Sequence, residues 1–284
     1  MPERWLAPLR GVTTRAFREE YAPEIREAGF CGAYAPFIPA NPGMRFDDRL
    51  LSELRPFPRD AADAPRLVPQ VIGKHPGALR EMLKALKDRG FECADLNAGC
   101  PFPMIRKKGR GSGLLADPDA LERMLEAGCD EMGPDRFSLK TRLGLERADE
   151  LLAILPRIDR YPLARLVVHA RTARQMYSGE CDAAMAARVA AASVNRVVPN
   201  GDIPLGGEGM IGRAFVRSLG VRCDAAARLA DYIARLRRGL SGDAPVLGHV
   251  KELVAYWRDE ASWRRVWPVL KLARTVDELL SSLP

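Results

Sequence analysis

This chain of 284 residues has little of what several protein classes require. It has only three histidines, and its six cysteines form no C-x-x-C pair, so neither a zinc site nor a disulfide framework is expected. No apolar run approaches the ~20 residues that span a membrane. The N-terminus carries charges and a proline where a signal peptide has its apolar segment. These absences predict a cytoplasmic protein with free thiols, without a metal ion and without a membrane partner.

A modest excess of positive charge is present, and its distribution is uneven. The formal net charge is +7, which permits a polyanionic partner but does not require one. Residues 226–284 carry ten Lys/Arg against seven Asp/Glu, together with Trp257, Trp263 and Trp267. This tail is either a helical bundle with a tryptophan core and a solvated basic face, or a surface for RNA. A second basic cluster follows Cys100 and consists of Arg106, Lys107, Lys108 and Arg110.

Short β-type segments alternate with longer segments of helical periodicity over most of the chain. Eight strands are predicted, at residues 5–9, 32–37, 66–72, 93–99, 137–143, 165–170, 196–201 and 209–213. Strands separated by helices pair in parallel, which indicates an α/β fold. Because there are eight of them, we expect a (β/α)8 TIM barrel rather than an open sheet.

Helices are predicted at residues 77–90, 118–130 and 148–158, where apolar residues recur at helical spacing. Asp117 followed by Pro118 is a typical helix start. After about residue 225 the pattern is helical only. We therefore expect two domains, a barrel over 1–225 and a small all-helical C-terminal domain over 226–284.

The connection between the last two predicted strands is too short for the expected barrel. Only six residues separate Ile203 from Met210, whereas a parallel crossover that contains a helix needs about a dozen residues. Either the seventh helix is absent, or a flexible segment is missing from this sequence. We favour the second explanation, because a barrel without that helix would expose apolar strand surface.

Polar or special residues stand at the ends of six successive predicted strands. In TIM barrels the carboxyl ends of the strands carry the chemistry. One such residue is a turn residue, but six in a row predict a polar pocket at one mouth of the barrel. The residues are Gln70, Asn97, Cys100, Lys140, Arg142, His169, Arg171, Asn200, Asp202, Gly212 and Arg213.

Several of these segments together resemble the tRNA-dihydrouridine synthase family. The resemblance runs from residue 6 to about 215 and lies in LAPLRGVTTRAFR, ADLNAGCP, KKGRGSGLLADP, SLKTRLG, VVHARTARQMYSGECD, PNGDI and GMIGR. The helical tail also resembles that of the family. The resemblance implies an FMN-dependent enzyme that reduces a uridine in tRNA, with NADPH as the electron donor. We expect it to act as a monomer.

The resemblance also implies the cofactor contacts. Lys140 would place its charge beside the flavin ring, where it stabilises the anionic reduced form, and Gln70 would bind the pyrimidine edge. The last two strand ends are where barrels often bind phosphate. The full set of implied FMN contacts is Ala7, Pro8, Leu9, Gln70, Lys140, His169, Asn200, Gly201, Asp202, Gly212 and Arg213.

Cys100 receives the catalytic role from its position in N-x-G-C-P. A thiol of ordinary pKa is protonated at neutral pH and can donate a proton to C5 of uracil, while hydride reaches C6 from the flavin. Substrate contacts are implied for Asn97, Arg142, Arg171 and Tyr177. The other five cysteines match no motif, and we expect them in the core.

Two departures from the family pattern are modest, namely Leu9 for Met and Ala170 for Gly. The short 203–210 connection is the serious one, because it flanks the implied phosphate site. Two other functions stay open at this point. One is an FMN-barrel oxidoreductase acting on a small pyrimidine or enone, and the other is an RNA-binding relative without flavin.

Overall fold

The computed structural model describes residues 3–48, 50–55, 65–222 and 224–283. Its ten strand segments are all parallel and form one sheet, in the order β3-β5-β6-β7-β8-β9-β10-β1-β2-β4. Their bounds are β1 Arg4–Leu6, β2 Phe30–Tyr34, β3 Ile38–Pro39, β4 Arg66–Val68, β5 Gln70–Ile72, β6 Ala94–Asn97, β7 Phe137–Gly144, β8 Arg165–Thr172, β9 Val197–Asn200 and β10 Gly209–Ile211.

The sheet closes on itself as a barrel of eight staves. β1 pairs with both β10 and β2, and β2 pairs with β4. β4 and β5 together make one strand position of the barrel, because only Pro69 separates them. β5 in turn pairs with β6. The short β3 extends the path of β2 and pairs with β5. The predicted TIM barrel is confirmed, and each of the eight predicted strands corresponds to one stave.

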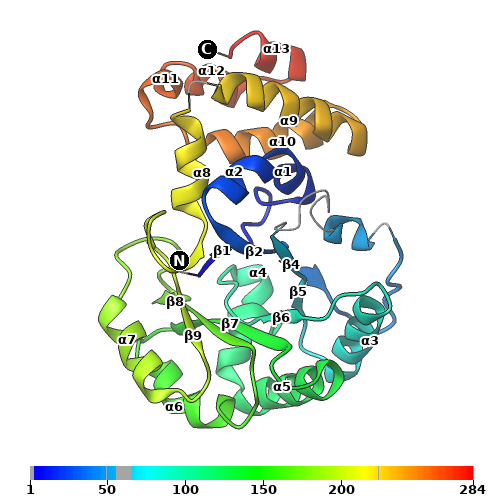
Figure 1. Ribbon diagram of the computed structural model, residues 1–284, viewed down its shortest axis with the longest axis vertical. Helices are drawn as coiled ribbons and strands as arrows, with labels where there is room; N and C mark the ends of the chain where they lie inside the picture. Colours follow the sequence, from blue (N-terminus) through cyan, green and yellow to red (C-terminus); the bar gives the residue numbers. More distant parts are fainter. Residues whose placement is uncertain (1–2, 49, 56–64, 223, 284) are drawn as a thin grey trace.

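Helices surround the barrel and continue beyond it (Figure 1). The α-helices are α1 Arg15–Glu20, α2 Ala22–Glu27, α3 Pro76–Lys87, α4 Pro103–Arg106, α5 Pro118–Met132, α6 Glu150–Ile158, α7 Ala183–Ala192, α8 Arg213–Gly220, α9 Ala225–Gly239, α10 Asp243–Val254, α11 Ala261–Arg264, α12 Trp267–Leu272 and α13 Val276–Leu280, with 3-10 turns η1 Leu50–Leu54 and η2 Gly111–Ala116. The predicted cap is present, because the Asp117 side chain accepts a hydrogen bond from the backbone N–H of Ala120 at 2.9 Å.

The short connection between β9 and β10 holds no helix, yet the barrel closes. Residues 201–208 return from the end of β9 as turns, and Met210 pairs in register with Asn200. Ile203 and Leu205 from this connection pack against the apolar cluster beneath the tail. On the outer side of β9, Pro199 is exposed and Val197 is half-buried. The connection thus covers only part of the surface that a helix would cover.

The helices α9–α13 form the upper lobe of the molecule in Figure 1, joined to the barrel by α8. Trp257 and Trp263 are buried, and the centroids of their rings lie 4.8 Å apart. Each indole N–H donates to a carbonyl of α8, from Trp257 to Val216 at 2.7 Å and from Trp263 to Gly220 at 2.8 Å. These two tryptophans therefore belong to the core and offer no stacking surface to RNA.

The tail shares one continuous apolar cluster with the barrel side of the molecule. Leu229, Ile233 and Val250 of the tail lie in the same cluster as Phe17 of α1 and Phe215 of α8. Ion pairs reinforce this contact, including Arg228 with Glu24 at 3.1 Å. Removing residues 226–284 would expose this cluster, so a truncated chain is a poor test of what the tail does.

Candidate active site

A cavity of about 1480 Å³ lies between the carboxyl ends of the strands and the helical tail. Small-molecule sites usually have about 300–1,000 Å³, so this one has room for a flavin and a nucleotide together. Every site residue predicted from the sequence lines it, with the exception of Gln70. The strand ends therefore bring these residues to one place, and their roles are a separate question.

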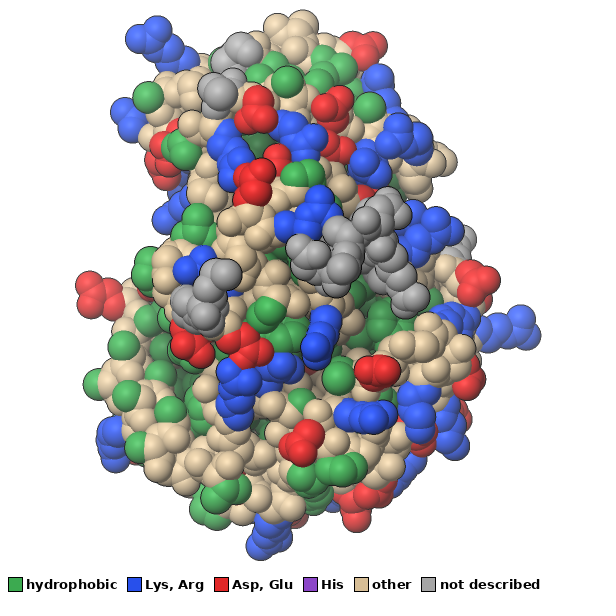
Figure 2. Space-filling model, viewed as in Figure 1, with side chains coloured by type: hydrophobic (Ala, Val, Ile, Leu, Met, Phe, Trp, Pro, Cys, Tyr) green, Lys and Arg blue, Asp and Glu red, His purple; other side chains and the backbone are tan. Residues whose placement is uncertain are grey.

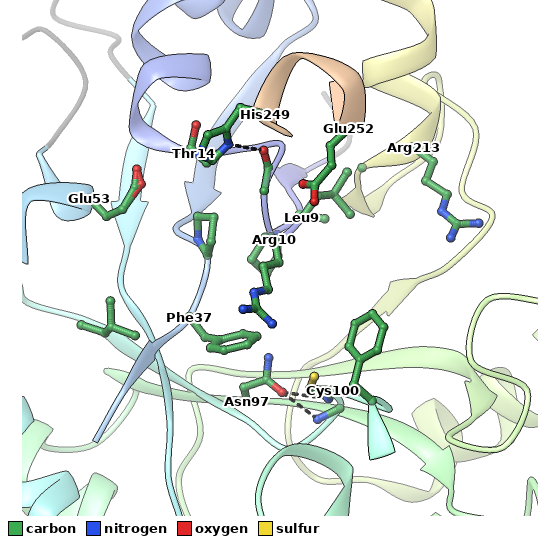
Figure 3. Close-up of a pocket in the computed structure, with 18 of the residues that line it drawn as sticks. Leu9, Arg10, Thr14, Phe37, Glu53, Asn97, Cys100, Arg213, His249 and Glu252 are labelled. Carbon is green, nitrogen blue, oxygen red and sulfur yellow. Dashed lines mark hydrogen bonds between the residues drawn. The ribbon is translucent and has the colours of Figure 1, made fainter. Parts of the chain in front are cut away.

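Cys100 lies at the floor of this cavity, in the turn that follows β6 (Figure 3). Its side chain is buried, with 7% of the residue exposed. Burial raises the pKa of the Cys100 thiol, and the nearby charges of Arg10, Arg142 and Lys140 oppose that rise only in part. A thiol held in this way remains protonated at neutral pH and can act as an acid.

A chain of hydrogen bonds leads from a buried carboxylate to the turn that bears Cys100. The Gln70 amide donates to Asp95 at 2.7 Å, and the Asn97 amide donates to Gln70 at 2.8 Å. The Asn97 oxygen then accepts from the backbone N–H of Cys100 at 2.9 Å and of Gly99 at 3.1 Å. Asp95 Oδ2 accepts the N–H of the Gln70 amide, and this contact fixes the orientation of both amides. Gln70 thus supports the floor of the cavity from below.

Two neighbouring titratable groups lie at the base of the cavity, with Lys140 half-buried in its lining and Asp95 fully buried below. Burial lowers the pKa of Lys140 to about 8, assisted by Arg142 and opposed by Asp95 and Cys100. Burial also raises the pKa of Asp95 to about 8, against the hydrogen bond from Gln70 and the charge of Lys140. Among the described residues Lys140 has no ion pair within hydrogen-bonding distance. It is therefore a cation available to an anionic ligand.

Two buried arginines are engaged mainly by the protein itself. Arg142 donates from Nε to the Gly99 carbonyl at 2.7 Å and from Nη1 to the carbonyls of Thr172 and Met176. It therefore ties the turn of Cys100 to the loop after β8, and its guanidinium carbon lies 5.2 Å from the centre of the Tyr177 ring.

Arg171 has even less freedom to bind a substrate. Its guanidinium forms an ion pair with Asp202 at 2.5 Å and donates to the Gly179 carbonyl at 2.7 Å and to Cys181 Sγ at 2.9 Å. This pairing lowers the pKa of Asp202. Arg171 and Asp202 thus hold the loop after β8 against the end of β9.

The ends of β9 and β10 meet at the start of α8. Asn200 donates to the Met210 carbonyl at 2.7 Å, and Gly201 has a φ of +132° with no room for a Cβ, which would lie 2.4 Å from Cys181 Sγ. Gly212 precedes α8, whose first backbone N–H groups have no acceptor within the helix. With Arg213 beside them, these groups form a seat for an anion such as phosphate.

His169 of β8 is buried and lines the cavity. Burial, together with the charges of Lys140, Arg142 and Arg171, lowers the pKa of its imidazole far below the usual value. His169 is therefore neutral and can exchange hydrogen bonds with a ligand without adding charge.

The comparisons with known proteins agree with this geometry. A family model described as dihydrouridine synthase (Dus) matches residues 5–205. The chain belongs to the dihydrouridine synthase family. A protein of Staphylococcus epidermidis named "Probable tRNA-dihydrouridine synthase" is 30% identical over 204 residues, which is 70% of this chain and 60% of that one. The tRNA-dihydrouridine synthase B of Vibrio cholerae is 30% identical over 203 residues, or 70% and 59% of the two chains. The chain thus spans about 60% of the length of these curated relatives.

Two solved structures have a similar fold. An old yellow enzyme homologue from Zymomonas mobilis has a TM-score of 0.55 at 12% identity, with 76% of this chain and 85% of that chain covered. Morphinone reductase has a TM-score of 0.52 at 11% identity, with 76% and 83% covered. At such low identity these likenesses show that this dihydrouridine synthase family member has the barrel fold, and nothing beyond it.

Several cavity residues of this family member were not singled out from its sequence. Arg10 points from the loop after β1 toward Asn97 and Cys100, beside the ring of Phe37 (Figure 3). His249 and Glu252 reach the cavity from α10, and His249 hydrogen-bonds the Gly11 carbonyl at 2.8 Å. Arg10 stands directly after the L-A-P-L motif, so inspection of the loops that follow motif strands could have found it. The α10 residues carry no comparable signal.

The other cysteines do not behave uniformly. Cys129 lies in the core as expected, but Cys31 is exposed, so the core prediction is wrong there. Cys93 and Cys181 are half-buried, and all five described cysteines are free thiols. Cys223 lies outside the described residues.

Among the residues that the structure describes, no three His, Cys, Asp or Glu side chains are grouped closely enough to bind a metal ion. In the same part of the chain, no helix has the length and apolar character needed to cross a bilayer.

Proposed function

We propose that this chain is an FMN-dependent enzyme that reduces the C5–C6 double bond of a uridine in tRNA to dihydrouridine, with NADPH as the external reductant. The observation that carries the proposal is the buried Cys100 thiol on the floor of a cavity whose walls hold cations for an anionic cofactor. Membership of the dihydrouridine synthase family supports it.

The described residues fit FMN. Lys140 is a half-buried cation without a close ion-pair partner in the described chain, and its place on the cavity floor suits the ring of the flavin. The start of α8, with Gly212 and Arg213, suits the phosphate. The backbone of Ala7–Leu9 lines the same wall, and Gly212 has little room for a Cβ, which would lie 3.0 Å from Ala7 Cβ. FMN, when bound and reduced, would supply hydride to C6 of the uracil.

The protein's own part in the reaction is a proton transfer. The S–H bond of Cys100 breaks as a C–H bond forms at C5, and the thiolate left behind takes a proton from solvent. Arg10 and Arg142 bring positive charge toward Cys100, which stabilises this thiolate. Arg142 and Asn97 also hold the turn, so the thiol keeps its direction.

The substrate is proposed to be tRNA rather than a free nucleoside, bound as a flipped-out uridine. Extracting a base from a stack costs a few kcal/mol, which contacts to phosphates can offset. Figure 2 shows Lys and Arg side chains on both lobes around the hollow between barrel and tail. Arg235 and Arg238 of α9 line the cavity from the tail side. We propose residues 226–284 as a tRNA-binding domain of a monomeric cytoplasmic enzyme.

Purified protein with FMN, NADPH and an unmodified tRNA transcript tests the proposal directly. Mass spectrometry should find one uridine converted to dihydrouridine, in a protein that carries flavin absorbance. A flavoprotein that reduces free uracil or a small enone, and leaves tRNA unchanged, would contradict it. A colourless protein that binds tRNA would point to a non-catalytic relative.

The role of the tail is better tested by charge than by truncation. Arg238 is exposed at the rim of the cavity, so Arg238→Gln should weaken tRNA binding and reduce its dependence on salt while leaving the flavin content unchanged. Equal salt dependence in both proteins would remove Arg238 from the interface.

A further inference from the structure

An exposed apolar patch lies at the rim of the active-site cavity. Phe102 is 40% exposed, Met104 is 77% exposed and Tyr177 is 41% exposed, and all three line the cavity. We call these three residues the rim patch. The other large exposed hydrophobic residues of the described chain are Val194, Val221, Val269 and Leu272, none of which lines this cavity. Large apolar side chains gathered at one exposed place indicate a binding surface.

The rim patch is built from the segments that follow β6 and β8, the two strands on either side of β7. Phe102 and Met104 follow Cys100 directly at the start of α4, and Tyr177 comes from the loop after β8. The rings of Phe102 and Tyr177 lie 6.4 Å apart at an angle of 56°. The patch therefore flanks the thiol on the solvent side, where the chain of a large substrate must pass.

The rim patch is held in place before any ligand arrives. Phe102 stands between Pro101 and Pro103, and two prolines restrict the backbone around it. Two guanidinium groups lie over the Tyr177 ring. The guanidinium carbon of Arg213 is 4.7 Å from the ring centroid, and that of Arg142 is 5.2 Å from it. A preformed surface loses little conformational entropy on binding.

Positively charged side chains follow the rim patch in the sequence, at the end of α4 and directly after it. Lys107 and Lys108 are exposed, and neither forms an ion pair with a described residue. Arg106 pairs with Glu146 at 3.7 Å. Aromatic side chains beside unpaired cations are the combination by which proteins bind unstacked nucleic-acid strands, with bases on the rings and phosphates on the cations. A partner protein or a lipid surface would not need both features next to a reactive thiol.

We infer that Phe102 and Met104, beside Tyr177, form a stacking surface for the base next to the target uridine in the same RNA strand, with Lys107 and Lys108 contacting the phosphates that follow. This inference rests on the proposed reduction of a tRNA uridine. Flipping one base removes a stacking partner from its neighbour, and the Phe102 ring would replace that partner.

Binding of an unmodified tRNA transcript to the flavin-loaded, full-length protein tests the inference. Base–aromatic stacking is large enough that Phe102→Ala should weaken binding about tenfold. Phe102→Trp should bind as the wild type does, because it keeps an aromatic face, and Phe102→Leu should remain weak although it keeps apolar area. Met104→Ala should reduce affinity by a smaller factor. Flavin content and the thermal unfolding midpoint should not change, because the side chain is exposed.

Val194→Ala is the matched control, since Val194 is 82% exposed and lines the cavity at the other end of the barrel. It should bind tRNA as the wild type does. A sharper control replaces the nucleotide beside the mapped target uridine by an abasic one. The wild type and Phe102→Ala should then bind with equal affinity, because the base that stacks is gone.

The outcomes separate this inference from the function on which it rests. If the wild type makes dihydrouridine in tRNA and Phe102→Ala binds tRNA equally well, the stacking surface is wrong and the function stands. If Phe102→Leu binds like the wild type, apolar contact alone suffices and stacking is again wrong. If the wild type neither binds nor reduces tRNA, the function falls and the stacking surface falls with it.

Discussion

The two ends of the barrel both carry arginines, but they differ in how many of these cations are paired. At the amino end a second cavity of about 1070 Å³ is lined by Arg89, Arg160 and Arg165. Each of these pairs with a carboxylate, at 3.0 Å for Arg89 with Asp48, 3.1 Å for Arg160 with Glu122 and 3.2 Å for Arg165 with Glu3. Most of the arginines that line this cavity therefore have a carboxylate partner, and exposed Arg66 is the exception among the described residues. At the carboxyl end, Lys140 and Arg10 have no ion pair with a described residue.

This difference separates charges that stabilise the fold from charges that await a ligand. A cation that is partly withdrawn from water without a partner costs free energy, so the retention of half-buried Lys140 at the carboxyl end indicates that a ligand supplies the missing charge. At the amino end most of the lining cations have a carboxylate partner, which is typical of the face of a TIM barrel that serves stability.

The largest expected effect is on the reaction rate, when a cysteine at the carboxyl end is replaced and compared with one at the amino end. Cys100→Ala removes the proposed acid and should lower the rate of dihydrouridine formation by 100-fold or more, an effect on the order of general acid catalysis. Flavin and tRNA binding should persist. Cys93→Ala, at the amino-end cavity, is the matched control and should react like the wild type.

The pH dependence of the wild type sharpens the same prediction. Burial raises the pKa of Cys100, and the reaction needs the protonated thiol. The single-turnover rate that depends on Cys100 should therefore stay level through neutral pH and fall only in the alkaline range. A rate that falls between pH 6 and 7, or a Cys100→Ala enzyme with normal turnover, would remove this thiol from the mechanism.

Lys140→Met should have the next largest effect, on flavin rather than on the thiol. Loss of the unpaired cation should weaken binding of reduced FMN about tenfold, which is one charge-assisted contact. Below its pKa of about 8 Lys140 is charged and would attract the anionic flavin proposed above, and above that pH this attraction would be lost. The wild-type affinity should thus fall as pH rises through about 8, and the variant should lack this decrease.

Arg160→Gln at the amino end is the control for Lys140, because it removes one charge that already has a partner. Isothermal titration with FMN under reducing conditions measures both proteins. Equal loss of flavin affinity in the two variants would mean that net charge, rather than the unpaired cation, attracts the cofactor.

Asp95→Leu should loosen the floor of the cavity without touching its lining. Gln70 would lose the acceptor of its amide, and the chain of hydrogen bonds to Asn97 would lose its fixed direction. We expect the backbone amides of Gly99 and Cys100 to exchange hydrogen about tenfold faster, since their shared acceptor becomes mobile.

Two variants make the exchange measurement specific. Asp95→Asn keeps an acceptor oxygen and should restore most of the protection, while Ser138→Ala, buried on the neighbouring strand at the same level, should leave exchange unchanged. Normal protection in Asp95→Leu would show that Asn97 needs no support from below. Should that protein fail to fold, a loss of protection in Asp95→Asn equal to that in Asn97→Ala would refute the role of the acceptor.

Most of the barrel could be predicted because its strands are apolar runs that end in polar residues. Helix α5 is similarly clear, since Asp117 and Pro118 mark its start and apolar residues repeat along it. Helix α7 was not predicted, because its alanine-rich sequence has no apolar stripe that differs from its other face. The closure of the barrel without a seventh helix depends on chain geometry, which spacing rules do not describe.

The candidate site divides in the same way. Residues at strand ends share a periodic signal, so Lys140, His169 and Asn200 could be placed together from the sequence. The contribution of α10 could not, because His249 meets Gly11 only through tertiary packing of distant segments. Nor could the sequence show that the Arg171 guanidinium donates its hydrogen bonds to Asp202 and the nearby loop, which leaves few of them for a substrate.

The smallest effect is expected from Glu3→Gln at the amino end. Glu3 forms ion pairs with Arg165 at 3.2 Å and with Arg196, and it accepts a hydrogen bond from the Trp5 indole at 2.8 Å. Glutamine keeps an oxygen for Trp5 and removes only the charge, so the free energy of unfolding should fall by no more than about 1 kcal/mol. Urea denaturation measures this change, and flavin affinity should stay within twofold of the wild type. A larger loss of flavin would mean that the two ends of the barrel are coupled, and that the paired charges at the amino end support the site as well as the fold.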